Sequence, residues 1–200
     1  MSGNANPTSI TINGNKAVVA TFTPAGPTCV TIQRGTRGQV ADTLIWSALP
    51  WYSFNTSRLY TGRLYGWGET RTLIRFSLDT LPTGAVIKSA TLGIKLDRPG
   101  SRETVKVYRI TQAWSEGKPT WNSFANKYDS SKTWGSLVAK GTGFVSADVT
   151  GLVSAWASNS KPNYGLMLKS SPNRSYDEYM SSETGTVGSR PWLKVCYTVP

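Results

Sequence analysis

The chain has 200 residues, with 22 lysines and arginines against 11 aspartates and glutamates and no histidine, so its formal charge is +11 at pH 7. This length fits one large β domain, or a smaller domain with an appendage. A domain of this size forms a hydrophobic core without the help of metals. Lack of histidine removes the usual general base and the commonest metal ligand. No apolar run approaches the ~18 residues of a membrane-spanning helix. The charge favours acidic polysaccharide, nucleic acid or an anionic cell surface as partner, unless it serves solubility alone.

Residues 1–27 differ in pattern from the rest of the chain. Residues 9–22 form two short β-type runs around Asn13-Gly14, which predicts a hairpin, and residues 23–27 (TPAGP) are typical of a linker. The hairpin resembles the last hairpin of bacterial extracellular β repeats and is too small to fold stably alone. We expect residues 1–27 to be a remnant of a preceding repeat-like region or to pack on the main domain, residues 28–200. No signal segment opens the chain, so we expect a piece of a longer exported protein.

From Thr28 onward, short runs of alternating apolar and polar residues predict one strand after another. The predicted strands cover residues 28–32, 71–78, 90–96, 105–110, 143–147, 164–169 and 192–199. Only residues 148–157 break the alternation, because Leu152, Val153 and Trp156 recur at helical spacing, with Asp148 or Thr150 as the cap. The sequence therefore predicts an all-β fold, a jelly-roll-like antiparallel β-sandwich with one short helix.

The two cysteines lie in predicted strands, Cys29 near the start of the domain and Cys196 near its end. A bond between them would join the first strand to the last, and in the chain-entropy model a loop of that length is worth about 4–5 kcal/mol. Such a bond persists only in an oxidising compartment, which favours an extracellular or cell-surface location. The alternative is two separate buried thiols.

Several blocks of the sequence, taken in order, carry a likeness to a known family. They are Ala41-Asp42-Thr43, SRLYTGR (57–63), RTLIRFSLDTLPTGAVIKSATLGIKL (71–96), VKVYRITQAWSEGKPTWNSF (105–124), ADVTGLVSAW (147–156), NYGLMLKSS (163–171) and MSSETGTVGSRPWLKVCYT (180–198). Through these blocks, from Cys29 to Pro200, the chain resembles the DNRLRE domain, which is also treated as a carbohydrate-binding module family.

The resemblance implies a β-sandwich on secreted or surface-attached bacterial and archaeal proteins, often joined to polysaccharide lyases or large adhesins. Some members bind alginate through basic residues, whereas others are spacers or matrix components. The resemblance therefore indicates the fold far better than the function. The chain departs from the family between Ile45 and Ser57, where members carry a polar loop and this chain has WSALPWYSF (46–54).

Basic residues are the predicted contacts for an acidic sugar. If strand 71–78 directs Ile74 and Phe76 inward, Arg71 and Arg75 stand on its outer face. A guanidinium binds a carboxylate with two parallel hydrogen bonds, so a row of them suits uronates or sulfated sugars. The alternative is a solvated face, or arginines paired with Asp79, Asp97 or Glu103. The full predicted set is Arg58, Arg63, Arg71, Arg75 and Lys95.

Aromatic residues in Gly- or Pro-flanked loops are the second predicted element of the site. Trp51, Tyr52 and Trp67 are the candidates, together with Trp46 and Tyr65 nearby. Exposed rings stack on the apolar faces of sugars and also adhere to proteins. The alternative is a loop folded onto its own rings. By contrast, Trp114, Trp121 and Trp156 fall inside the family blocks and are predicted to be core residues.

Acidic residues give only a weak candidate for a metal site. Asp177, Glu178 and Glu183 lie in the predicted loop before the last strand, and with Asp129 or Asp42 they would offer oxygen ligands to a structural Ca²⁺. Salt bridges to Arg174 or Arg190 are the alternative, and no other cofactor is expected.

Catalysis is not expected, because the chain contains no Ser/His or Cys/His pair and no outstanding pair of carboxylates. No nucleic-acid-binding motif is present either. The sequence predicts a non-catalytic extracellular binding module for an acidic polysaccharide, alginate-like or pectic, within a larger secreted protein. The alternative is a structural or adhesive surface module, a spacer or self-associating fibre subunit without a glycan ligand.

Overall fold

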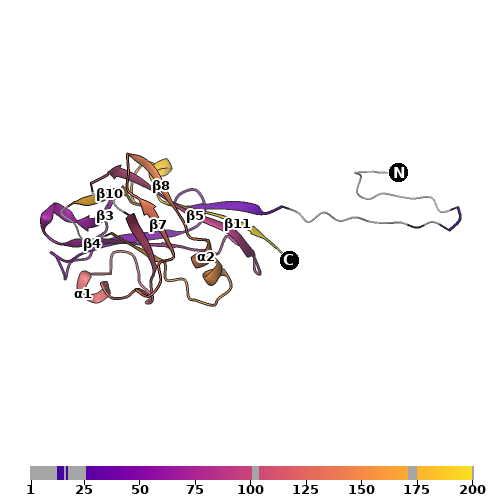
Figure 1. Ribbon diagram of the computed structural model, residues 1–200, viewed down its shortest axis with the longest axis horizontal. Helices are drawn as coiled ribbons and strands as arrows, with labels where there is room; N and C mark the ends of the chain where they lie inside the picture. The colour runs from indigo at the N-terminus through magenta and orange to yellow at the C-terminus, as the bar shows by residue number, and fades with distance from the viewer. Residues whose placement is uncertain (1–12, 16, 18–25, 101–103, 171–174, 200) are drawn as a thin grey trace.

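The computed structural model describes residues 13–15, 17, 26–100, 104–170 and 175–199. The hairpin predicted over residues 9–22 and the linker that follows lie almost entirely outside these residues. The described strands form one antiparallel sheet of 11 strands that curls on itself around a core (Figure 1). This confirms the predicted all-β sandwich with a short helix. Within the described ranges, no helix combines the length and the apolar character needed to span a membrane.

The strand order along the sheet is β1-β11-β5-β10-β3-β4-β9-β6-β7, with β2 paired to β4 and β8 paired to β5. The helical elements are α1 (Trp121–Phe124), α2 (Thr150–Ala157) and the 3-10 turns η1 (Leu64–Gly66) and η2 (Val187–Ser189). The strands are β1 (Thr28–Gln33), β2 (Val40–Trp46), β3 (Arg58–Arg63), β4 (Glu69–Phe76), β5 (Val86–Arg98), β6 (Thr104–Arg109), β7 (Gly135–Val138), β8 (Gly143–Asp148), β9 (Leu166–Lys169), β10 (Tyr176–Met180) and β11 (Trp192–Thr198).

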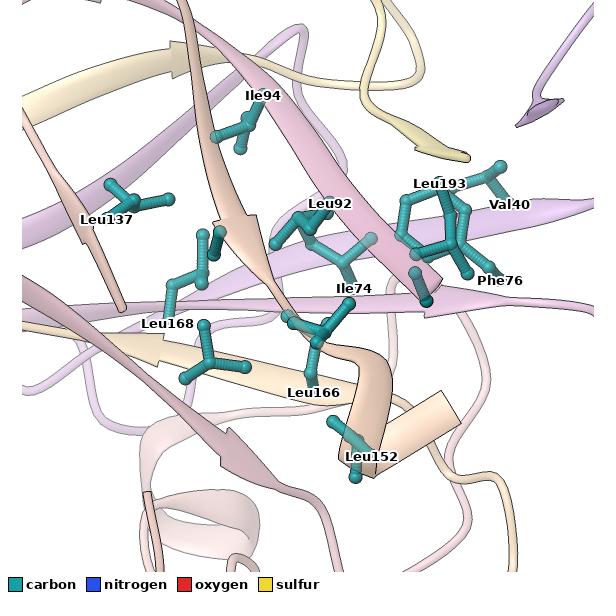
Figure 2. Packing of buried hydrophobic residues seen from close by; sticks show 14 of the residues in the cluster. Val40, Ile74, Phe76, Leu92, Ile94, Leu137, Leu152, Leu166, Leu168 and Leu193 are labelled. Carbon is teal, nitrogen blue, oxygen red and sulfur yellow. The ribbon is translucent and has the colours of Figure 1, made fainter. Parts of the chain in front are cut away.

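The main core lies between the two halves of the curled sheet. Ile74 of β4 and Leu92 of β5 are fully buried in it, as the period-two patterns of their strands predict. Figure 2 shows both side chains directed into the same interior as Leu166 of β9. Helix α2 closes one side of this interior with Leu152, which makes it the predicted short helix.

Two polar side chains at the start of α2 make hydrogen bonds with different roles. The carboxylate of Asp148 accepts a hydrogen bond from the backbone N–H of Thr150 at 2.8 Å, so it satisfies a free donor of the first turn. The hydroxyl of Thr150 instead accepts from the N–H of Ala90 at 2.9 Å and ties the helix to β5. Of the two predicted capping residues, only Asp148 therefore serves the helix end.

Cys29 and Cys196 form a disulfide, as predicted, and the two-thiol alternative is wrong. The two residues stand opposite each other on the antiparallel strands β1 and β11, with Cα atoms 4.0 Å apart. Because β1 is the last strand of the sheet on that side, the bond fastens an edge strand to its neighbour. The first and last strands of the domain are thus adjacent in the sheet.

A second apolar cluster covers the other face of β2, β4 and β9. Ile45, Leu73 and Met167 extend from these strands into it, and the segment 110–134 supplies the residues that cover them. That segment includes Trp114, which is buried, and Phe124 of the single-turn helix α1. Strand β4 is consequently buried on both faces, which its alternating sequence did not predict.

Candidate functional site

Arg71 does not lie on an open face of the sheet, so that expectation is wrong. Only 7% of the surface of Arg71 is exposed, because the segment 110–134 crosses this face of β4. The Nε of Arg71 donates to Glu69 at 2.7 Å, and its Nη1 donates to the carbonyl of Ala125. The guanidinium also lies 4.6 Å from the centre of the Trp121 ring. All of these contacts are internal, so Arg71 holds the covering segment in place.

Three more of the predicted cations also have partners within the protein. Arg75 is half-buried and donates to the carbonyl of Trp114 at 2.8 Å. Arg58 forms ion pairs with Asp97 at 2.6 Å and Glu178 at 3.3 Å. The remaining one, Lys95, donates to the hydroxyl of Ser189 at 3.0 Å.

Arg63, at the end of β3, is the predicted cation that is exposed. In the part of the chain that the structure describes, its side chain forms no hydrogen bond or ion pair. The five cations therefore do not form one continuous row. The pairing of Arg58 with Asp97 matches the alternative that the sequence left open.

The predicted aromatic residues are exposed on two loops at one end of the sandwich. Trp51 is 81% exposed and Tyr52 59% exposed on the loop between β2 and β3. Tyr65 is 64% exposed and Trp67 78% exposed on the loop between β3 and β4. These four residues are called the aromatic rim below. Trp46 does not belong to it, because it ends β2 and packs half-buried against the main core.

The start of the β2–β3 loop lies beside the end of the β3–β4 loop. The N–H of Ser47 donates to the carbonyl of Glu69 at 2.9 Å, and the N–H of Glu69 donates to the Ser47 hydroxyl at 2.8 Å. Between them, Gly68 has a φ of +144°, and a Cβ built there would stand 2.9 Å from the backbone nitrogen of Ala48. This close approach requires glycine. The glycine at this position therefore allows the backbones of the two loops to pack against each other.

Each loop is also held by hydrogen bonds of its own. The N–H of Tyr52 donates to the carbonyl of Leu49 at 3.0 Å, and the N–H of Trp67 donates to that of Leu64 at 2.9 Å. Tyr65, within η1, has φ of 48° and ψ of 24°, the left-handed region that a residue with a side chain rarely occupies. Such strain costs about 1–3 kcal/mol and concentrates at binding and switch regions. The loops therefore present their rings on an ordered backbone.

A row of tyrosines continues from the aromatic rim onto β10 and β3. The ring of Tyr65 lies 5.3 Å from that of Tyr176, edge to face, and Tyr176 lies 5.8 Å from Tyr60. Arg98 donates to the Tyr176 hydroxyl at 2.8 Å. Partial burial, with the nearby charge of Glu178, raises the pKa of Tyr60 to about 12. The hydroxyl of Tyr60 is therefore a neutral donor and acceptor at physiological pH.

A comparison with models of known families gives the family of this sandwich. The model of carbohydrate-binding module family 96 matches residues 40–196 of the chain. The chain belongs to this family. A comparison with curated proteins finds no match. The family is one of non-catalytic binding modules, which implies a polysaccharide partner. The match thus confirms the carbohydrate-binding part of the predicted resemblance, while the DNRLRE assignment and alginate specificity stay predictions.

The three predicted calcium ligands of the module are not brought together. Asp177 and Glu178 lie on β10 rather than in a loop, so that placement was wrong. Asp177 is fully buried and accepts from the N–H of Gly100 at 3.0 Å, whereas Glu178 pairs with Arg58 on the outer face. Glu183 lies beyond the end of the strand.

Glu183 instead meets Asp42 and Glu116, and the structure groups these three carboxylates within 4.8 Å of one another. They are called the acid cluster below. Asp42 was one of the alternative ligands considered from the sequence, and Glu116 was missed. Burial raises the pKa of Asp42 well above its usual range, and the nearby Glu183 adds to the shift.

A pocket of about 590 Å³ lies between the β4–β5 connection and α2. Arg75, Asp79 and Asn163 are among its lining residues. The amide of Asn163 is already used, because it donates to the carbonyl of Phe76 and accepts from the N–H of Gly165. No rim residue lines this pocket, so it is a poorer candidate for sugar binding than the aromatic rim.

Proposed function

We propose that this family 96 module binds an acidic polysaccharide outside the cell, alginate-like or pectic, without cleaving it, and that the aromatic rim is its contact surface. One observation carries the proposal. Trp51 and Trp67 are about four-fifths exposed on loops whose backbones are hydrogen-bonded. Burying a large aromatic side chain is worth about 2–3 kcal/mol, so two such rings left in water indicate a surface that a partner covers.

The rings are suited to sugars because they are flat and already positioned. An aromatic ring packs against the apolar C–H face of a pyranose, while its polar edge remains in water. Because the loops are ordered before the ligand arrives, little further conformational entropy is lost on binding. Trp51 and Tyr52 on one loop, with Trp67 on the other, give a polymer more than one ring to contact.

The charge of the module supports an acidic rather than a neutral polymer. The whole chain has a formal charge of +11, which attracts polyanions, and Arg63 is an exposed guanidinium immediately before the η1 loop. A guanidinium binds the carboxylate of a uronate in bidentate fashion. Arg58 and Lys95, which are partly accessible, are secondary contacts in this proposal, and Arg71 and Arg75 are assigned to the fold.

Affinity electrophoresis tests the proposal with gels that contain alginate, polygalacturonate or a neutral glucan. We expect retardation by at least one acidic polymer and much less by the neutral one. Trp51→Ala and Trp67→Ala should each remove most of the retardation. Phe144→Ala is the matched control, because Phe144 of β8 is 45% exposed but lies outside the aromatic rim, and it should migrate like the parent.

Absence of retardation by every acidic polymer, or full retardation of both rim variants, would overturn the proposal. In that case the exposed rings favour the alternative function, a structural or adhesive module that self-associates. Light scattering distinguishes the two functions. Growth in particle size with protein concentration, without any glycan binding, would support the adhesive function instead.

A further inference from the structure

The acid cluster assembles from parts of the chain that are far apart in sequence. Asp42 lies near the start of β2, Glu116 precedes α1, and Glu183 follows β10. Trp46, at the other end of β2, is four residues from Asp42, about 13 Å along the strand. The acid cluster therefore lies away from the start of the β2–β3 loop of the aromatic rim, although the end of that loop returns beside it, with Phe54 hydrogen-bonded to Thr43 and Asn55 next to Gly117.

The oxygens of the acid cluster are only partly satisfied by the protein. Asp42 is 1% exposed, and its Oδ2 accepts from the N–H of Ser182 at 2.7 Å. The other oxygen, Oδ1, is buried and has no hydrogen-bond partner, and the same holds for Oε2 of Glu183. A buried carboxylate oxygen without a partner costs about 1–3 kcal/mol or more, so it points to a group that the protein itself does not supply.

The charges of the acid cluster are also unbalanced. Arg34 is its cation and contacts both Glu116, at 3.0 Å, and Glu183. When all three carboxylates are ionised, they and the single guanidinium carry a net charge of −3 + 1 = −2, and burial raises the pKa of Asp42 because this charge is not compensated. Arg75 lines the adjoining pocket, and its Nη1 donates to the carbonyl of Trp114 rather than to one of the three carboxylates. A divalent cation would neutralise the remaining charge.

We propose that Asp42, Glu116 and Glu183 bind a structural Ca²⁺ ion. Carboxylate oxygens are hard ligands, and Ca²⁺ binds them at about 2.3–2.6 Å with irregular geometry and both mono- and bidentate contacts. Two ligands on opposite sides of such an ion are about 4.8 Å apart, which the spacing of the three carboxylates does not exceed. Asp42 Oδ1 and Glu183 Oε2 are the oxygens available for this bond.

The site has an access route and a structural role. A pocket of about 240 Å³ is lined by Arg34 and Glu116, so an ion reaches the acid cluster without opening the core. Bound there, Ca²⁺ fastens the turn after β10 and the loop before α1 to β2. It stabilises the fold and takes no part in sugar contact.

Thermal unfolding of the protein, first treated with a chelator and dialysed, tests the site with CaCl₂ alone as the probe. We expect Ca²⁺ at saturating concentration to raise Tm by about 5 °C or more. Native mass spectrometry should show one Ca²⁺ per chain. Asp42→Asn should abolish both effects, whereas Asp79→Asn, which removes an exposed carboxylate elsewhere, should retain them.

The Asp42→Asn variant also separates ion binding from a purely structural role of the carboxylate. After chelation it should be at least as stable as the parent, since it removes one buried charge and keeps an acceptor for the Ser182 N–H. Glu183→Gln should behave in the same way. The proposal is overturned if Ca²⁺ does not change the Tm of the parent, which is expected if two carboxylates share a proton, or if Asp42→Asn keeps the full shift.

Discussion

The face of β4 that carries Arg71 and the aromatic rim are neighbouring surfaces with opposite environments. On the β4 face, the guanidinium of Arg71 is taken up by Glu69, the Ala125 carbonyl and the Trp121 ring. On the rim, the larger part of each ring lies in water. The cation that the sequence favoured as a ligand contact stabilises the fold, and the rings remain available. Contacts already made within the protein, rather than residue type, separate a structural side chain from a binding one.

Removal of Arg71 should produce the largest change in stability. Arg71→Ala leaves Glu69 without its closest cation and the covering segment without its hydrogen bond to Ala125, so we expect a loss of about 3 kcal/mol in the free energy of unfolding. Arg58→Ala, which breaks the more exposed ion pairs with Asp97 and Glu178, should cost less than about 1 kcal/mol. Urea unfolding measures both. Equal costs for the two variants would mean that the covered face is not held by Arg71.

Removal of a rim tryptophan should weaken sugar binding and leave the stability of the fold almost unchanged. Trp67→Ala should change the free energy of unfolding by no more than about 0.5 kcal/mol, since the side chain is mostly in water. Affinity for an acidic oligosaccharide should fall about tenfold, equivalent to about 1.4 kcal/mol. Calorimetric titration beside urea unfolding checks the two values. A large loss of stability with unchanged affinity would mean that Trp67 stabilises the fold and does not contact the sugar.

Arg63 should have a smaller effect that depends on salt. As an exposed cation, it should contribute to the binding of a uronate chiefly at low ionic strength, where charges are weakly screened. We expect Arg63→Ala to weaken affinity a few-fold in low salt, with the difference from the parent narrowing as salt is added. Arg63→Lys should recover part of the loss, because the charge returns without the bidentate fork. An Arg63→Ala variant with parental affinity at every salt concentration would exclude this contact.

Alkaline titration should give the smallest effect and concerns the tyrosine row beside the rim. The pKa of Tyr60 is about 12 in the folded protein against an ordinary value of 10.0. A raised pKa means that the neutral form contributes stability in full below pH 10.0, and that this stability is lost as pH rises toward about 12. Tyrosinate absorbance of the parent minus that of Tyr60→Phe should show this late transition. A difference transition near pH 10.0 would show that Tyr60 is more solvated than its contacts imply.

The sequence predicted most of the sandwich because alternation is a local property. The strands around Ile74 and Leu92 and the helix at Leu152 were predicted from patterns within a few residues. The cystine was predicted because the chain has two cysteines and both lie in predicted strands. Strand β10 was missed because YDEYM has acids at its centre, and one of these, Asp177, is buried. Alternation along a strand shows which face of the sheet a side chain lies on, but it does not show whether another segment covers that face.

The same reason limits prediction of the sites. Trp51 and Trp67 were candidates because they lie in Gly- or Pro-flanked loops, and both are exposed. The burial of Arg71 depends on the segment 110–134, and the acid cluster depends on Glu116, which is far from Asp42 in the chain. Such long-range contacts leave no mark in the spacing of residues.

The indole N–H signals of the tryptophans test the central claim most directly, because each reports its own ring during titration with an acidic oligosaccharide. We predict that the signals of Trp51 and Trp67 shift, while that of Trp114, whose indole N–H donates to the Tyr164 carbonyl, stays in place. Trp192, which lies on β11 against Phe144, should also stay in place. Shifts confined to Trp192, with Trp51 and Trp67 unchanged, would contradict the account and move the binding surface to the face of β5, β8 and β11.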